Sequence, residues 1–256
     1  MEKPAQAYPP SPCGRLEGEV RAGDLDLGGR MGAIAALRWF QDGVWLHAED
    51  LGVGQETFHA RHLAWVIVRQ EVLFAPVMPS WRAPLTLCTW PRTPDRLYYY
   101  RDYLLRSGDQ TVARCATAWI VMDLANSCPV HPEDCEGVHT HPLPPVTGKV
   151  PPRIRFRPED GDERGSRRVC FGDLDPSGHL NHTRAAEWML DLLPPDALHH
   201  LRLKRWSLNY LREARPGTVL ETRHRWVDEG LWEAGLLLDT DQPSALCQAE
   251  WVEAKA

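Results

Sequence analysis

The chain has 256 residues and a formal net charge of -6, with 43% hydrophobic and 25% charged residues, a composition typical of a globular protein. No block of concentrated positive charge is present, which argues against a nucleic-acid partner, and no apolar run approaches the ~18 residues of a membrane span. The first residues lack the apolar core of a secretory signal, and the odd number of scattered cysteines favours reduced thiols. We therefore expect a cytoplasmic protein without a disulfide framework.

The first half of the chain predicts one helix followed by four strands, after a flexible Pro-containing tail at residues 1–15. Apolar residues recur every three or four positions between Gly29 and Leu51, as on one face of an amphipathic helix. Stretches rich in β-branched and aromatic residues, separated by turn residues, then predict the strands, which we place at residues 62–74, 85–90, 97–105 and 111–123. These elements make up a first domain, residues 16–127.

A Pro-rich linker at residues 128–166 separates the two halves, because such a composition holds neither a helix nor a central strand. Four potential metal ligands lie in it: Cys128, His131, Cys135 and His139. Their spacing lacks the paired C-x-x-C of common structural zinc sites, so we favour an accidental cluster and expect no metal.

The second half, residues 167–256, repeats the order of the first. Residues 167–171 predict a strand and residues 183–193 a helix, whose apolar positions form one stripe that ends at Pro194. Four strands are predicted after it, at residues 203–213, 219–227, 231–238 and 245–252. One helix and four sequential strands, repeated at a spacing of roughly 140–150 residues, predict an α+β fold in which each half wraps an antiparallel sheet around one long helix.

The residues FGDLDPSGHLNH, which run from Phe171 to His182, concentrate polar groups between the predicted strand and helix of the second half. Asp175 and His179 there can activate water or attack an acyl carbon, beside a helix N-terminus that can polarise a carbonyl oxygen. The alternative is that Asp175 and Ser177 only cap the helix. The residues alone leave these two interpretations about equally supported.

Glu213 ends the predicted strand RWSLNYLRE, in which Trp206, Leu208 and Tyr210 alternate as the buried face. Strict alternation places Glu213 on the opposite side, together with Ser207 and Asn209, and by itself this indicates a solvated strand end.

Several motifs in order resemble the acyl-acyl-carrier-protein (acyl-ACP) thioesterases of plants and bacteria, from about Gly29 to Trp251. FQDGVWLH, from Phe40, is similar to the family's LQ-x-x-A-x-x-H helix, and DLDPSGHLNHTRAAEW, from Asp173, resembles its D-x-D-x-N-x-H-V-N-N-x-x-Y-x-x-W signature. NYLREA, from Asn209, is similar to its Y-x-R-E-C strand. The chain departs from these patterns at four positions, with residues Ser177 for Asn, His182 for Asn, Ala185 for Tyr and Ala214 for Cys.

The resemblance implies a tandem (double) hotdog fold and hydrolysis of fatty acyl-ACP to free fatty acid, without a cofactor. It implies a catalytic network of Asp175, Ser177, His179 and Glu213, with Asp175 as base or nucleophile, and helix-start amides near His179 to Asn181 that polarise the carbonyl. The first half would hold the acyl chain, and the expected substrate-binding residues are Asn181, Trp39, Phe40, Trp45 and Trp65. The expected partner is acyl carrier protein with its phosphopantetheine-linked chain, with no membrane and no nucleic acid, and we expect a monomer or a homodimer.

Three alternatives stay open at this point: an acyl-CoA thioesterase, a hotdog dehydratase that uses His179 with a carboxylate, and a non-catalytic acyl-binding protein. The sequence does not predict a chain-length preference, because it does not determine which of the side chains of Trp39, Phe40 and Trp45 face inward.

Overall fold

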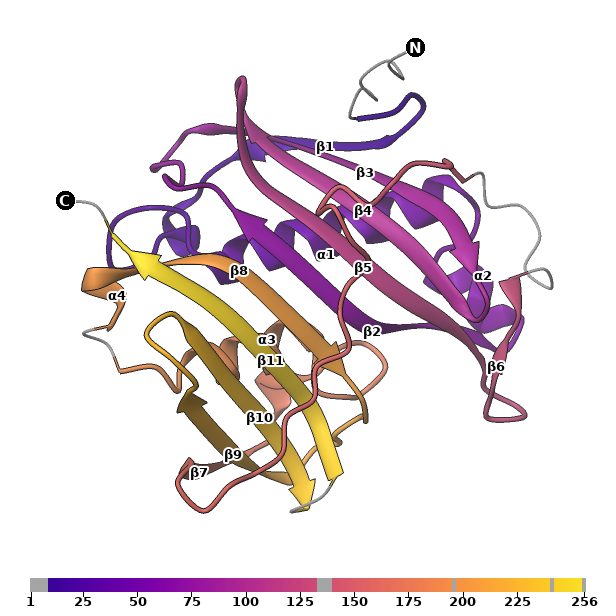
Figure 1. The fold of residues 1–256 in the computed structure, drawn as a ribbon. Coiled ribbons are helices and arrows are strands. Elements are labelled where there is room, and N and C mark those ends of the chain that lie inside the picture. The colour runs from indigo at the N-terminus through magenta and orange to yellow at the C-terminus, as the bar shows by residue number, and fades with distance from the viewer. Residues whose placement is uncertain (1–8, 133–139, 195–196, 240–241, 255–256) are drawn as a thin grey trace, which may run out of the picture. The chain divides into compact units, whose positions relative to one another are not determined.

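A computed structural model describes residues 9–132, 140–194, 197–239 and 242–254 (Figure 1). The chain divides into two compact units, Met1–Pro151 (unit 1) and Pro152–Ala256 (unit 2). The segment predicted as a linker is therefore shared between them. In the described ranges, no helix is both long and apolar enough to cross a membrane.

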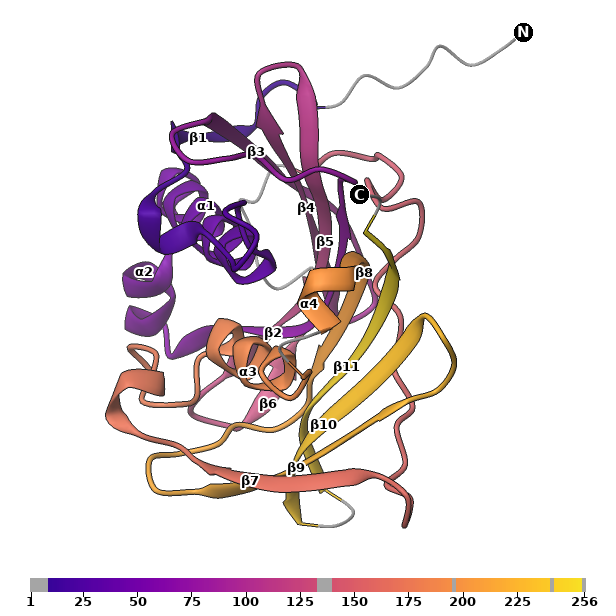
Figure 2. The same ribbon diagram turned by 90° about the vertical axis from the view of Figure 1, so that its left-hand side faces the viewer.

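Unit 1 is an antiparallel sheet with one long helix against it (Figures 1 and 2). The strands lie in the order β1-β3-β4-β5-β2, and a short strand, β6, pairs with β5. Their bounds are β1 Gly14–Glu19, β2 Leu63–Phe74, β3 Pro84–Asp95, β4 Tyr98–Ser107, β5 Gln110–Asp123 and β6 Cys128–Val130. The helices are η1 Ala22–Asp24 (a 3₁₀ turn), α1 Ala33–Asp50 and α2 Gln55–Ala60.

Helix α1 packs closely on this sheet, with contacts to β1 and β3. Its buried residues are Ala35, Ala36, Leu37, Phe40, Gly43 and Ala48. A Cβ at Gly43 would lie 2.4 Å from a methyl carbon of Leu87 on β3, so glycine is what allows the helix to approach this strand. The Phe40 ring packs against Tyr103 of β4, with 5.3 Å between centroids.

The strands of unit 2 lie in the order β7-β9-β10-β11-β8. This is the order of unit 1 when strands are matched by their place along the chain, so that β7 corresponds to β1 and β8 to β2. The strands are β7 Glu163–Arg168, β8 Leu201–Tyr210, β9 Val219–Trp226, β10 Leu231–Asp239 and β11 Gln242–Glu253. The helices are η3 Phe171–Asp173 (a 3₁₀ turn), α3 His182–Leu190 and α4 Ala197–His200. Helix α3 contacts β10 and β11 and buries Trp188 and Met189, as its predicted stripe requires. The α+β fold with a repeated helix-on-sheet unit is thus confirmed.

Three element predictions were wrong in detail. Strand β1 begins within the tail that was expected to be flexible, whose residues 1–8 lie outside the described ranges. The strand predicted at residues 167–171 is β7, which ends at Arg168, so that Phe171 begins the 3₁₀ turn η3 instead. Strand β8 ends at Tyr210, and Glu213 lies in the loop after it.

Residues 141–149 cover the outer face of the unit 1 sheet. Leu143 and Val146 pack on an apolar cluster of Cys88, Trp90 and Leu104. The backbone N–H of Val146 donates to Asp102 Oδ2 at 2.9 Å, and Arg92 Nε lies 3.1 Å from its Oδ1. Burial raises the pKa of the Asp102 carboxyl to about 6, against the opposing effect of Arg92.

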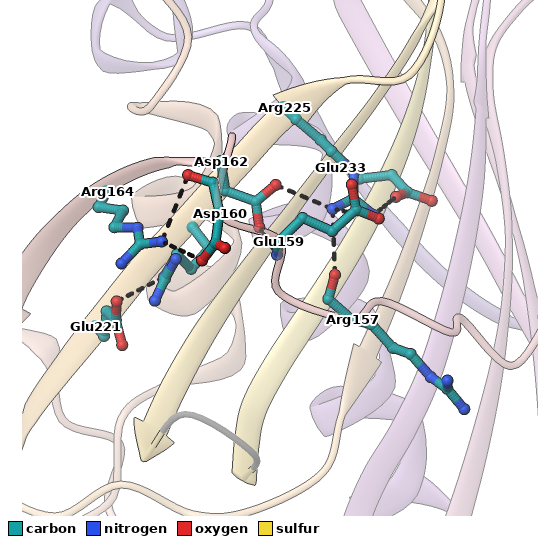
Figure 3. Close-up of polar contacts among 9 residues, drawn as sticks. Arg157, Glu159, Asp160, Asp162, Arg164, Glu221, Arg225 and Glu233 are labelled. Atoms are coloured by element: carbon teal, nitrogen blue, oxygen red, sulfur yellow. Dashed lines mark hydrogen bonds and ion pairs between the residues drawn. The ribbon is translucent and has the colours of Figure 1, made fainter.

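Residues 152–162 cover part of the unit 2 sheet in a similar way. Asn209 accepts the N–H of Ile154 at 2.8 Å and donates to the Pro152 carbonyl at 2.9 Å. Further along, Arg225 of β9 pairs with Asp162 at 2.9 Å and with Glu233 of β10 at 3.2 Å (Figure 3).

This covering segment corrects the alternation expected for β8. Ser207 and Asn209 are 3% and 1% exposed, so the side predicted to be solvated is as buried as the side of Trp206 and Leu208. Alternation predicts one solvated face only where nothing else packs on the sheet.

Candidate active site

The polar run of unit 2 forms a tight turn that is held by the carboxylate of Asp175. Its Oδ1 accepts the backbone N–H of Ser177 at 2.9 Å and that of His179 at 3.1 Å. The Asp175 N–H donates in turn to the His179 carbonyl at 2.8 Å, and Gly178 has a φ of 79°, a conformation that glycine adopts without strain. Oδ2 of Asp175 has no hydrogen bond to another described residue, so it stays available while Oδ1 fixes its direction.

The loop after β8 brings Glu213 to this turn. The N–H of Leu180 donates to the Ala214 carbonyl at 2.8 Å, which fastens the loop to the turn. His179 Nε2 then lies 3.1 Å from Glu213 Oε2, and Arg215 Nη2 lies 3.0 Å from the other oxygen of Glu213. Because Glu213 lies next to Nε2, we assign the proton of the neutral imidazole to Nε2, which donates it to the carboxylate. Nδ1 of His179 is then an acceptor. No sequence motif pointed to Arg215 as a site residue.

The start of helix α3 is capped by Asn181, whose Oδ1 accepts the N–H of Thr183 at 2.8 Å. The expectation of free amides near His179 to Asn181 was wrong, because all three N–H groups are used within unit 2: that of Asn181 donates to the Asp173 carbonyl at 2.8 Å. The backbone N–H of His182, the first residue of α3, has no acceptor among the described residues.

His182 itself is held in an apolar setting. Its ring meets that of Tyr210 edge-on, with 5.5 Å between centroids, and burial lowers its pKa to about 4. It is therefore a neutral imidazole at physiological pH.

Unit 1 contains a second copy of the turn, which the sequence analysis missed. Asp26 Oδ1 accepts the backbone N–H groups of Gly28 at 2.9 Å and Arg30 at 3.2 Å, and Gly29 has a φ of 66°. The N–H of Met31 donates to the Pro79 carbonyl at 2.8 Å, as Leu180 does to Ala214. The signal was present, since GDLD occurs at residues 23–26 and again at 172–175.

The remaining residues that were expected to bind substrate lie in unit 1. Phe40 is 2% exposed in the core, whereas Trp45 is 44% exposed. Trp39 is half-buried against Gly18 of β1. Trp65 of β2 stacks on Phe58 and donates to the Val53 carbonyl at 2.9 Å.

Two of the four potential zinc ligands, Cys135 and His139, lie outside the described residues. In the part of the chain that is described, no group of His, Cys, Asp or Glu side chains is arranged to hold a metal ion.

Two repeated units, each an antiparallel sheet with a helix packed against it, define the class as a protein of the double hotdog fold. Models of two domains match most of the chain: the acyl-ACP thioesterase N-terminal domain over residues 16–136 and the C-terminal domain over residues 158–253. The chain belongs to the acyl-ACP thioesterase family.

Curated relatives include two chloroplastic palmitoyl-acyl carrier protein thioesterases. That of Arabidopsis thaliana is 25% identical over 186 residues, which cover 69% of this chain and 44% of the relative. That of Cuphea hookeriana is 23% identical over 191 residues, which cover 69% and 46%. The chain thus spans about half the length of the curated relatives it matches.

Among solved structures, an acyl-ACP thioesterase from Bacteroides thetaiotaomicron superimposes with a TM-score of 0.85. The match covers 94% of this chain and 98% of that one at 20% sequence identity, a level that shows a common fold.

Proposed function

We propose that the chain hydrolyses the thioester of a fatty acyl-ACP, releasing the free fatty acid and the carrier protein, at the turn of unit 2. The observation that supports this proposal most strongly is the meeting of Asp175, His179 and Glu213, where a carboxylate with one free oxygen lies in the same turn as a carboxylate–imidazole pair. These are the groups that a hydrolytic acyl transfer requires.

In the proposed reaction, Oδ2 of Asp175 takes a proton from a water molecule as the water attacks the thioester carbon. The carbon–sulfur bond breaks, and the proton taken by Asp175 passes to Nδ1 of His179, whose transient positive charge Glu213 stabilises. The departing thiolate of phosphopantetheine takes this proton from His179, which restores the site. Direct attack by Asp175 to give an acyl anhydride is the second form of this chemistry.

For the developing oxyanion, we propose the backbone N–H of His182, which lies at the positive end of α3. We assign a substrate contact to Asn181. Contacts of Trp39, Trp45 and Trp65 with the acyl chain stay a prediction, and Phe40, which is 2% exposed and packs on Tyr103, would shape that site only from within the core. Ser177, which is exposed, contributes its backbone N–H to the turn and places its hydroxyl at the surface of the site.

The departures from the family's sequence pattern are compatible with this chemistry. Ala214 is 2% exposed and acts through its carbonyl, so a cysteine at this position would place its thiol in the buried interior. The thiol is therefore not needed as the nucleophile in this chain.

The test is hydrolysis of acyl-ACPs of several chain lengths by the wild type, Asp175→Asn and Asp26→Asn. The amide keeps an oxygen for the two backbone N–H groups but loses the charge. We expect turnover by the wild type and Asp26→Asn, and a loss of at least about a hundredfold in kcat for Asp175→Asn. No turnover at any chain length, or an unaffected Asp175→Asn, would contradict the proposal.

The same assay separates the rival activities. Equal rates on matched acyl-CoA and acyl-ACP would favour an acyl-CoA thioesterase, and conversion of a 3-hydroxyacyl substrate to an enoyl product would favour a dehydratase. A single turnover in water enriched in oxygen-18 tests the anhydride route, because incorporation of the oxygen label into the Asp175 carboxyl would indicate it.

A further inference from the structure

A partly buried ion pair between Asp173 and Arg184 joins the unit 2 turn to helix α3. Oδ1 of Asp173 accepts from Arg184 Nη2 at 3.1 Å and from Nε at 3.3 Å, while its Oδ2 accepts the N–H of Cys170 at 2.9 Å. Asp173 is 6% exposed, and Arg184 also pairs with Glu187 on the same helix. Two N–H groups of one guanidinium that converge on a single carboxylate oxygen restrict the direction of the contact as well as its length.

The copy of the turn in unit 1 shows that this ion pair is not needed to form the backbone. Asp24 takes the place of Asp173: it accepts the N–H of Arg21 at 2.8 Å, and its carbonyl accepts the N–H of Gly32 at 2.8 Å. The position that corresponds to Arg184, three residues after the helix N-cap, is the buried Ala35. Among the described residues, no arginine side chain pairs with the Asp24 carboxylate, whose partner is the backbone N–H of Arg21.

In the described parts of the chain, this ion pair therefore occurs only in unit 2, which also carries the imidazole–carboxylate pair. There, the Asp173 carbonyl holds the N–H of Asn181, the cap of α3. Arg184 ties the Asp173 carboxylate to the first turn of that helix. The two contacts hold the turn, which carries Asp175 and His179, against the start of α3, which carries the backbone N–H of His182.

We propose that Arg184 is a positioning residue of the active site, acting through Asp173 to hold the reactive turn in register with the start of α3. This inference rests on the proposed function, because it assigns the turn and the helix start to one reaction. Small displacements between reacting groups are costly, since misplacement by about 1 Å can lower a rate by about a hundredfold.

The test uses Arg184→Met, which keeps much of the side-chain volume, and Arg184→Lys, which keeps the charge but not the fork. With acyl-ACP as substrate, we expect kcat to fall about tenfold for Arg184→Met with KM within about twofold, and Arg184→Lys to recover part of the loss. Asp173→Asn combined with Arg184→Met should be no worse than the poorer single variant, because both act on one contact. The control in unit 1, Asp24→Asn, should keep the wild-type kcat.

Amide hydrogen exchange supplies a measurement that does not depend on turnover. In folded Arg184→Met, exchange at the backbone N–H of His179 should be faster by about tenfold, while the N–H of Arg30 in the unit 1 turn should be unchanged. An unchanged rate at His179 would overturn the positioning role even if the enzyme is active. If exchange at His179 is faster in Arg184→Met but the wild-type protein hydrolyses no thioester, the proposed function is contradicted and the role of Arg184 in holding the turn still stands.

Multiplying losses in the double variant, or equal acceleration at His179 and Arg30, would also overturn the proposal. The first result would show that Arg184 acts independently of Asp173, and the second that its loss loosens the whole protein.

Discussion

Two turns of the molecule, one before α1 and one before α3, share a backbone and differ in their side chains. In each, an aspartate oxygen accepts two backbone N–H groups, a glycine takes a positive φ, and the residue before the N-cap donates to a carbonyl of the loop between the next two strands. The aspartates are Asp26 and Asp175.

The groups around the two aspartates differ. Arg30 stands in unit 1 where His179 stands in unit 2, and Gly32 is the N-cap where Asn181 is. The loop residues whose carbonyls accept the N–H of the residue before each N-cap are Pro79 and Ala214. The residue before each of them is Met78 in unit 1 and Glu213 in unit 2. The aspartate therefore stabilises the backbone of the turn in both units, whereas the chemistry of the turn depends on the side chains around the aspartate.

Among the contrasts between the two turns, a large effect is expected from Glu213→Gln. It leaves His179 without its charged partner and should lower kcat on acyl-ACP by about a hundredfold, within the range for general acid–base groups. Met78→Gln, at the corresponding position of unit 1, should leave kcat unchanged. Equal losses from both substitutions would show that neither turn is specialised for catalysis.

The second prediction concerns acid stability, and we test it with His47 of unit 1 and His182 of unit 2. Burial, assisted by Arg101, lowers the pKa of His47 to about 4, and burial alone lowers that of His182 to about 4. Between pH ~6.5 and pH 4 the unfolded chain binds protons that the folded chain does not, so stability falls as the pH falls through this window. His182 should contribute about 1–2 kcal/mol to this fall, and His47, which is only half-buried, should contribute less because solvent screens it.

Urea unfolding at pH 7 and pH 5 measures this effect. His47→Gln and His182→Gln should each reduce the difference in unfolding free energy between the two pH values, whereas replacement of the exposed His199 should not. The same pH difference in all three variants would contradict the assignment.

The two aspartates should have similar effects on stability. Asp26→Ala and Asp175→Ala each remove an acceptor for two backbone N–H groups, and each should lower the unfolding free energy by about 1–2 kcal/mol. Denaturant unfolding measures both, and a much smaller loss for Asp26→Ala would show that the unit 1 turn does not depend on its carboxylate.

The smallest effect is expected from Ser177→Asn, which restores the residue that the family's pattern has here. The backbone N–H of Ser177 already serves the turn, so the new amide should change kcat by about threefold or less. Gly28→Asn at the matching position of unit 1 should have no effect on kcat. A tenfold change from Ser177→Asn would give that side chain a direct part in the reaction.

Much of the fold could be predicted because long alternating strands and a long amphipathic helix carry their own pattern. Strand β1 could not, since GRLEGE is short and polar and is held by its pairing with β3. The burial of Ser207 and Asn209 depends on the covering residues 152–162, which lie about fifty residues away in sequence. Local alternation contains no information about such a cover.

For the site, the turn itself was predictable from Pro176 and Gly178, and Glu213 from the family's motif. The partnership of Glu213 with His179 depends on a loop fastened by the Ala214 carbonyl, which is tertiary structure. Arg184 and Arg215 gave no signal, because an arginine on a helix or in a loop is usually solvated surface.

The most direct test of the account compares His179→Gln with Arg30→Gln, the two side chains that distinguish otherwise matching turns. The measurement is kcat/KM for a purified acyl-ACP at neutral pH, with amide exchange at both turns to confirm that each backbone is intact. We predict a loss of at least about a hundredfold for His179→Gln and a wild-type value for Arg30→Gln. Comparable activity in the two variants would contradict the claim that unit 2 alone carries the chemistry.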